Sequence, residues 1–315
     1  MPVECLSRGG GYCVPMKRAG CLLLAIVPVV VTAGAYFFTP AHPGGQGLGG
    51  PAASAGPHGG QESGAAGGTE EDELVEELPP GLAAPAKKEL AQKIVASAVN
   101  STTDWRATYG TIRDTGDGRG YTAGILGFCT GTHDLLELVE RYTEDHPGNG
   151  LARYLPALRA VDGTDSHEGL DPGFTQAWRA EAEVEAFQDA QEAERDRAYF
   201  GPAVRLAKLD GLGDLGQLVY YDAMVLHGPG TEANGFYELR ERVMADADTP
   251  AEGGSEPAYL DAFLDVHREA VVARGRGGVD TGRVDTMLRR FLADGNLGLD
   301  TPLEWEIGGR TYRAE

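Results

Sequence analysis

The chain has 315 residues and carries 27 basic and 48 acidic side chains, a formal net charge of −21. This acidic balance repels nucleic acid and anionic lipid, so we expect neither as a partner, and it suits a cationic one. Three of the four cysteines precede residue 22. The remainder of the chain therefore has neither a disulfide framework nor a zinc site made of several cysteines.

The first 41 residues are predicted to be a targeting segment. Lys17 and Arg18 precede an almost wholly apolar run over residues 20–38, which is the order found in secretory signal peptides. The run is also about long enough to span a bilayer, so an uncleaved membrane anchor facing outward is the alternative. We expect a secreted, extracellular protein that meets a membrane only if this segment is retained.

Residues 42–86 are rich in glycine, alanine and proline and end in an acidic run over residues 70–77. Such a segment has too little apolar surface to offset the entropy lost on ordering, so we expect a disordered linker. The folded part is then one domain over residues 87–315, which keeps 24 basic and 40 acidic side chains, a net charge of −16. We expect this domain to be a monomer.

The domain is predicted to be mainly helical with a small sheet. Apolar residues recur at helical spacing over residues 87–100. Asp117-Gly118 in the glycine-rich segment 111–128 is a strong hairpin signal. Pro202 is expected to interrupt or kink a long helix that begins near residue 174. Further helices are expected from residue 133 to about 147 and over residues 151–161, 203–210, 212–227, 234–247, 258–274 and 283–293, with a short hairpin over residues 303–313.

Asp117 is the first candidate for chemistry, because a hairpin loop can hold its carboxylate out into a cleft. Inverting glycoside hydrolysis needs one carboxylic acid to protonate the leaving oxygen and a separate carboxylate to activate water. The Thr122 hydroxyl could orient that water, and Arg119 could tune the pKa of Asp117 or contact substrate. Taken alone, these residues indicate only a turn and an exposed cation. The seven histidines form no metal-binding motif, so we expect no metal and no cofactor.

Longer segments carry a resemblance to a known family. In chain order they include residues 116–122 (GDGRGYT), 127–129 (GFC), 152–158 (ARYLPAL), 194–197 (ERDR), 220–223 (YYDA), 227–230 (HGPG) and 259–264 (YLDAFL). The domain resembles the chitosanases of glycoside hydrolase family 46 over essentially its whole length. The resemblance implies a lysozyme-like fold of two lobes with a cleft between them. It also implies endo-hydrolysis, with inversion, of chitosan, the polymer of β-1,4-linked glucosamine.

The resemblance also implies roles for individual residues. Asp117 matches the general base and Thr122 the residue that holds the attacking water. Asp134 matches a carboxylate that recognises a glucosamine amine. An acid in the first turn of a helix is also favoured by the helix dipole, and both roles can hold for Asp134.

Three positions depart from the family pattern. Val99 stands where the family has its catalytic glutamate, the proton donor. Asp222 and Arg283 match a buried ion network, but His267 replaces its second arginine, and a shorter, titratable side chain weakens that network. Arg274 stands where the family can place a substrate-binding glutamate, and a cation there repels a polyamine.

These departures leave three hypotheses. The first is a chitosanase whose activity is impaired because Val99 replaces the general acid, with the proton supplied by another carboxylate or by the substrate. The alternative is a catalytically inactive chitosan-binding protein. The third is a surface-anchored envelope protein whose cleft is vestigial.

Overall fold

The computed structural model describes residues 66–315, except residue 232 and residues 276–279. The predicted signal or anchor and the first part of the predicted linker lie outside the described residues. The described residues belong to one compact unit of the chain, residues 61–315. Within the described part, no helix is long and apolar enough to cross a membrane.

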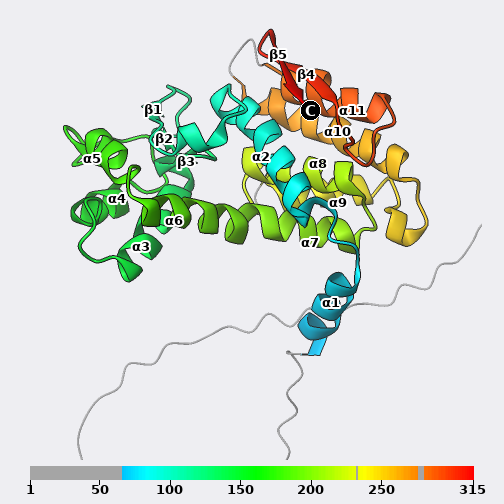
Figure 1. Cartoon of the computed structure of the whole chain (residues 1–315), viewed down its shortest axis with the longest axis horizontal. Helices are drawn as coiled ribbons and strands as arrows, with labels where there is room; N and C mark the ends of the chain where they lie inside the picture. The colour runs from blue at the N-terminus through cyan, green and yellow to red at the C-terminus, as the bar shows by residue number, and fades with distance from the viewer. Residues whose placement is uncertain (1–65, 232, 276–279) are drawn as a thin grey trace, which may run out of the picture. The chain divides into compact units, whose positions relative to one another are not determined.

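The described residues form a mainly helical domain with two small antiparallel sheets, which confirms the predicted fold class (Figure 1). The sheets are β1 (Ile112–Asp114), β2 (Tyr121–Ala123) and β3 (Phe128–Cys129), and then β4 (Leu303–Ile307) with β5 (Arg310–Ala314). The α-helices are α1 (Ala66–Glu77), α2 (Pro85–Asn100), α3 (Asp134–Asp145), α4 (Leu155–Val161), α5 (Phe174–Glu181), α6 (Glu185–Arg195), α7 (Gly201–Leu209), α8 (Asp214–His227), α9 (Phe236–Met244), α10 (Glu256–Arg274) and α11 (Arg289–Ala293). The division into two lobes with a cleft between them stays a prediction.

Part of the segment predicted as a linker, residues 66–86, is helical in the structure. The helix α1 covers its acidic run, and α2 begins at Pro85. Arg205 on α7 pairs with Glu71 at 2.9 Å and with Asp72 at 3.0 Å. The glutamates of the acidic run favour helix, and the exposed pairs with Arg205 add little to its stability.

The long helix predicted from residue 174 is broken at a different place. α5 ends at Glu181 and α6 begins at Glu185, whereas α6, the π-helical turn η5 (Asp196–Phe200) and α7 follow one another without a gap (Figure 1). Pro202 lies in the first turn of α7. A proline is tolerated there, since its missing N–H is not needed at the start of a helical segment that follows a widened turn.

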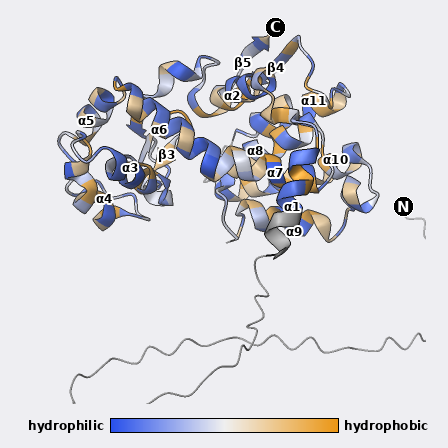
Figure 2. Ribbon diagram, turned by 60° about the horizontal axis from the view of Figure 1, so that its bottom comes forward, coloured by the Kyte–Doolittle hydropathy of each residue, from blue (hydrophilic) through white to orange (hydrophobic). Residues whose placement is uncertain are grey.

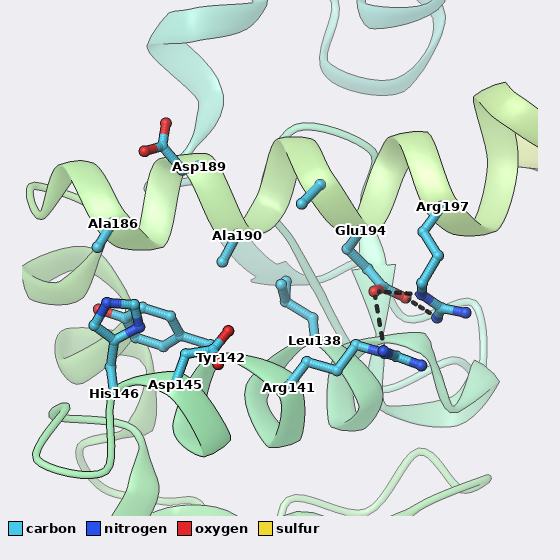
Figure 3. A pocket seen from close by; sticks show the side chains of 11 residues that line it. Leu138, Arg141, Tyr142, Asp145, His146, Ala186, Asp189, Ala190, Glu194 and Arg197 are labelled. Carbon is cyan, nitrogen blue, oxygen red and sulfur yellow. Dashed lines mark hydrogen bonds and ion pairs between the residues drawn. The ribbon is translucent and has the colours of Figure 1, made fainter.

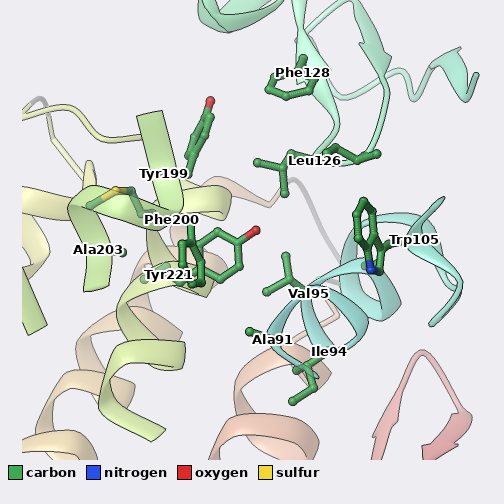
Figure 4. Packing of buried hydrophobic residues seen from close by; sticks show 14 of the residues in the cluster. Ala91, Ile94, Val95, Trp105, Leu126, Phe128, Tyr199, Phe200, Ala203 and Tyr221 are labelled. Atoms are coloured by element: carbon green, nitrogen blue, oxygen red, sulfur yellow. The ribbon is translucent and has the colours of Figure 1, made fainter. Parts of the chain in front are cut away.

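The hydrophobic core holds α2 against the centre of the domain. Hydrophobic residues gather where α7, α8 and α10 pack together (Figure 2). On α2, Ile94 and Val95 are buried, and Val95 lies near Tyr221 of α8 and Phe200 (Figure 4). Full burial of an aliphatic side chain contributes about 1.5–3 kcal/mol. This packing fixes the C-terminal end of α2, which carries Val99 at the edge of the core.

Candidate functional site

The first hairpin carries Asp117 at its tip. β1 and β2 pair antiparallel, and Asp114 opposite Tyr121 is the last pair before the loop. Gly118 has φ of +86°, a left-handed conformation that glycine adopts without strain, so the chain can turn directly after Asp117. The loop therefore leaves the Asp117 carboxylate partly exposed, as the hairpin signal in the sequence predicts.

Arg119 holds the Asp117 carboxylate in place. Its backbone N–H donates to Oδ1 at 3.1 Å, and its side chain donates to Oδ2 from Nη2 at 2.7 Å and from Nε at 3.0 Å. Burial acts to raise the pKa of Asp117, but hydrogen bonds from Arg119 and Thr115 and the Arg119 charge outweigh it and lower that pKa. Asp117 is thus an ionised carboxylate at neutral pH, as a group that accepts a proton from water must be.

Gly127 brings Val99 and Thr122 to either side of one backbone position. A Cβ atom on Gly127 would lie 3.1 Å from Thr122 Cγ2 and 3.2 Å from Val99 Cγ1. Thr122 is buried opposite Cys129 in the β2–β3 register, and its Oγ1 lies 3.3 Å from Cys129 Sγ. The position of Val99 therefore adjoins the hairpin, but its side chain has no polar atom to offer.

Two adjoining cavities lie beside this hairpin. We name the first the Asp117 cavity; it has a volume of about 550 Å³. We name the second the Asp134 cavity; it has a volume of about 260 Å³ and also reaches Tyr199 and His227. Thr122 is in the lining of neither cavity. Both cavities are lined by Arg119, Thr132, Leu226 and Arg274.

Asp134 begins α3, and both of its carboxylate oxygens accept hydrogen bonds. Oδ1 accepts hydrogen bonds from the N–H of Cys129 at 2.9 Å and the Thr132 hydroxyl at 2.7 Å, and Oδ2 accepts from the Tyr199 hydroxyl at 2.7 Å. Burial raises the pKa of Asp134, although these hydrogen bonds oppose the rise. Asp134 therefore ties the start of α3 to β3 while it lines a cavity, so the structural and the binding interpretation are compatible.

Asp222 and Arg283 form a buried ion pair, with Arg283 Nε 2.9 Å from Asp222 Oδ1. Burial raises the pKa of Asp222, and the Arg283 charge opposes this rise. His267 is fully buried, and neither of its ring nitrogens has a hydrogen-bond partner among the residues described. Its ring instead meets that of His227 edge to face, with centroids 4.8 Å apart. His267 thus lies near this pair without taking an arginine's place in it.

The buried histidines predict acid-sensitive stability. Burial lowers the pKa of His227 to about 2 and of His267 to about 3, and nearby positive charges add to the effect. Between about pH 6.5 and 5 the unfolded state binds protons at both residues while the folded state does not, so stability falls as pH falls. The contribution of each histidine approaches about 1.4 kcal/mol per pH unit.

We expect this loss in urea unfolding measured at pH steps from 7 to 5, a range above the titration of ordinary carboxyl groups. The His267→Gln variant lacks one of the two groups and should lose less stability over the same range. His133, whose pKa is raised by Asp162, gives stability a pH dependence of the opposite sign. This effect is present in both proteins, so it cancels in the comparison. Equal pH dependence in the two proteins would contradict the prediction.

Arg274 ends α10 and lies between the two cavities. Its Nη1 donates to the Leu226 carbonyl at 2.6 Å and its Nη2 to the His227 carbonyl at 2.9 Å. These are the last carbonyl groups of α8, where a cation is also favoured by the helix dipole. The arginine thus has a structural role and adds positive charge to both cavities.

A third cavity, of about 420 Å³, lies between α3 and α6 and is lined by none of the predicted site residues (Figure 3). Its buried carboxylate, Glu194, pairs with Arg197 and lies 3.6 Å from Arg141. Because two cations neutralise this carboxylate, we assign it to the packing of α6 against α3. Among the described residues, no group of histidine, cysteine and carboxylate side chains is arranged to hold a metal ion.

Comparison with known proteins identifies the family. Residues 93–303 match the family model described as glycosyl hydrolase family 46. The chain belongs to this family. A chitosanase from Streptomyces sp. is 53% identical over 232 residues, which cover 74% of this chain and 83% of that protein.

Two solved chitosanase structures are similar to the chain. Chitosanase OU01, co-crystallised with substrate, has 47% identity and a TM-score of 0.72, and the match covers 75% of this chain and 99% of that one. A glutamate-to-alanine variant of the Bacillus subtilis MY002 chitosanase, complexed with six glucosamine units, has 32% identity and a TM-score of 0.67. That match covers 72% of this chain and 98% of the other.

Three contacts in this family 46 member are missed by reasoning from the sequence. They are the hydrogen bond from Tyr199 to Asp134, the packing of His227 on His267, and the close approach at Gly127. His227 and Gly127 stand in the HGPG and GFC segments that carry the resemblance, which was the only available signal. Tyr199 had none, because its contact depends on how η5 packs beside α3.

Proposed function

We propose that this family 46 member binds chitosan, and that its endo-hydrolysis with inversion is strongly impaired because Val99 replaces the general acid. The observation that carries the proposal is the placement of Val99 beside Gly127 and Thr122, with the ionised Asp117 on the same hairpin. An inverting hydrolase needs a proton donor opposite its base. Asp117 can activate water, but the Val99 side chain has no proton for the leaving oxygen.

One other carboxylate is available to supply a proton. Asp280 is the only carboxylate besides Asp117 in the described lining of the Asp117 cavity. It is exposed, and its Oδ1 accepts a hydrogen bond from the N–H of Gly282 at 2.8 Å. If hydrolysis persists, Asp280 is the residue that we expect to support it, and Asp280→Asn should then remove it.

The relatives support binding more strongly than turnover. The Streptomyces protein is a chitosanase at 53% identity, and chitosanase OU01 forms a complex with substrate. The glutamate-to-alanine variant from Bacillus subtilis holds six glucosamine units, so in that protein ligand binding survives the loss of one glutamate. By the same logic, Val99 should leave the binding of glucosamine oligomers largely intact.

The second candidate is a chitosan-binding protein without catalysis, which is favoured by Val99 and by the ring nitrogens of His267, since these have no hydrogen-bond partner among the described residues. One experiment separates the candidates: the products formed from glucosamine hexamer are followed over days, beside a calorimetric titration of the same oligomer. Slow cleavage with binding supports the impaired enzyme, and binding alone supports the binding protein. Absence of both results would refute the proposed function.

Binding of glucosamine hexamer is expected to depend on charge. The folded domain is strongly acidic and the ligand is a polycation, so affinity should fall as salt rises and as pH passes above the pKa of the ligand amines. The check is a titration at low and high salt, with the fully N-acetylated hexamer as the uncharged control. Equal affinity for the charged and the uncharged oligomer would show that binding does not depend on the charge of the ligand.

A further inference from the structure

A stacked pair of rings lies at the base of the first hairpin. The ring of His167 is nearly parallel to that of Tyr121, with 8° between the planes and 4.0 Å between the centroids. Tyr121 begins β2 and pairs with Asp114, and this is the last pair before the loop that carries Asp117. His167 comes from the segment between α4 and α5 (Figure 1). A residue distant in the sequence therefore contacts the hairpin at the point where its two strands separate.

Two carboxylates flank the imidazole ring of His167. Its Nε2 lies 3.4 Å from Asp114 Oδ2, and its Nδ1 lies 3.7 Å from Asp171 Oδ2. Asp171 Oδ1 also accepts a hydrogen bond from the Tyr121 hydroxyl at 2.7 Å. These side chains form one connected group, which we name the hairpin clamp: Asp114, Tyr121, His167 and Asp171. The hairpin clamp joins both strands of the hairpin to the chain just before α5.

Asp114 connects the hairpin clamp to the loop. Its Oδ2 faces the imidazole, and its Oδ1 accepts a hydrogen bond from the N–H of Gly116 at 2.7 Å, directly before Asp117. The other side of the loop is held separately, because the Gly131 N–H donates to the Arg119 carbonyl at 2.9 Å. The N-terminal side of the loop thus depends on Asp114 and on the residues that fix Asp114.

Within the hairpin clamp, His167 is the residue whose charge changes near neutral pH. Histidine ordinarily titrates between pH 5 and 8, whereas carboxyl groups titrate below this range. Burial, the hydrogen bond to Asp171 and the charges of Asp171 and Asp114 raise the pKa of Tyr121 to about 12, so the tyrosine stays neutral. Arg179 of α5, which also acts on Tyr121, keeps its charge throughout this range.

Protonation of His167 strengthens each of its contacts. The imidazolium has an N–H on both ring nitrogens, so both Asp114 and Asp171 face a donor. It also places a positive charge between two carboxylates that otherwise repel each other. Over the face of Tyr121, a cation is favoured by the charge distribution of the ring. The hairpin clamp therefore holds more tightly at pH 5.5 than at pH 7.5.

We propose that His167 is a positioning residue for Asp117: through the hairpin clamp it holds the loop over residues 115–120, and its protonation tightens that hold. The inference rests on the proposed function, which assigns Asp117 as the base. The order of the loop, however, is a property of the free protein, so it can be measured without a ligand.

The test is the backbone order of the loop, measured by NMR for the Gly116 and Gly118 amides of the full chain at pH 5.5 and 7.5. In the parent protein we expect order parameters of about 0.85 at pH 5.5, the value of a rigid backbone, and a fall towards about 0.6 at pH 7.5. His167→Phe keeps a ring on Tyr121 but has no ring nitrogens, so its loop should have about 0.6 at both pH values. Equal order parameters in the parent and in this variant would overturn the inference.

Two further variants separate the charge from the fold. Asp171→Asn removes one carboxylate at an exposed position but keeps an acceptor for the Tyr121 hydroxyl, so it serves if His167→Phe does not fold. It should reduce the pH dependence of the order parameters by about half, and an unchanged pH dependence would contradict the role of charge. The matched control is His146→Phe, because His146 also stacks on a tyrosine, Tyr142, but lies just after α3 and outside the hairpin clamp. It should leave the loop unchanged, and an effect equal to that of His167→Phe would overturn the inference.

The rate of hydrolysis gives the functional measurement. Where the glucosamine hexamer is cleaved, His167→Phe should lower kcat by about fivefold at pH 5.5 and leave KM unchanged, because the substrate contacts remain while the base is less well placed. At pH 7.5 the two proteins should differ by less than about twofold. A kcat equal to that of the parent at pH 5.5 would exclude the positioning role. If the hexamer is not cleaved, that result bears on the proposed function, and the order parameters alone decide whether the hairpin clamp holds the loop.

Discussion

Val99→Glu is expected to raise the rate of glucosamine hexamer hydrolysis by about 10²–10⁴-fold, the usual contribution of general acid catalysis. The substitution restores a carboxyl group at the end of α2, next to the hairpin that carries Asp117. Initial rates measured by product chromatography provide the check. Val99→Gln is the matched control, because it has the same shape as glutamate but no acidic proton, and it should remain as slow as the parent.

The His267 position decides how complete the restoration is. The buried Asp222–Arg283 pair has no second arginine, and the nitrogens of His267 are unpartnered within the described part of the chain. A new glutamate at position 99 therefore gains full support only in the double variant Val99→Glu with His267→Arg. If this double variant binds the hexamer but hydrolyses it no faster than the parent, Val99 does not occupy the donor position.

Asp117→Asn is expected to abolish hydrolysis, both any residual activity of the parent and the activity regained by Val99→Glu. The asparagine keeps the size and the turn preference of aspartate but cannot accept the proton of the attacking water. Stability should change by less than about 1 kcal/mol, since the Asp117–Arg119 pair is partly exposed. The measurements are the rate and the melting temperature of each variant.

The lowered pKa of Asp117 predicts how its contribution to stability depends on pH. Because its pKa is lowered in the folded protein, Asp117 stays ionised below the ordinary aspartate value of about 3.9. Its pairing therefore stabilises the fold at neutral pH, and this contribution is lost only as pH falls through the lowered pKa.

An Asp117→Asn protein that unfolds would identify a structural turn residue instead, and one that hydrolyses chitosan like its parent would exclude Asp117 as the base.

Thr122→Val provides a graded comparison for the base. Valine keeps the methyl group that packs against Gly127 and removes the hydroxyl, which lies 3.3 Å from Cys129 Sγ. We expect a smaller loss of rate than for Asp117→Asn, because the base is retained and the buried Thr122 hydroxyl lines neither cavity. A loss as large as that of Asp117→Asn would assign the more important role to the hydroxyl.

Local patterns in the sequence predict most of the elements. The apolar spacing on α2 and α8 and the turn at Asp117-Gly118 depend on neighbouring residues, so they can be read from the chain. The break between α5 and α6 after Glu181 cannot be predicted from the sequence, because residues 182–184 are Ala-Glu-Val and contain neither glycine nor proline. Pro202 does not separate two helices, because α6, η5 and α7 follow one another without a gap and the proline lies in the first turn of α7.

The candidate site also has some contacts that the sequence predicts and others that it does not. The Asp117 carboxylate and its Arg119 partner lie two residues apart, and the hairpin motif is enough to bring them together. The His227–His267 contact joins α8 to α10, and the Tyr199–Asp134 bond joins η5 to α3, so both depend on the tertiary arrangement. The burial of the Thr122 hydroxyl against Cys129 is local, and it depends on the β2–β3 register, which the sequence did not predict.

Gly127 has a consequence for any attempt to rebuild the enzyme. Its φ is +72°, and a side chain there would press on both Val99 and Thr122, so the end of α2 approaches the hairpin only as closely as a hydrogen atom allows. Inverting glycosidases depend on the separation between their two carboxyl groups. In the Val99→Glu variant, the distance between the carboxyl groups at positions 99 and 117 would therefore depend on Gly127, a residue that has no functional group of its own.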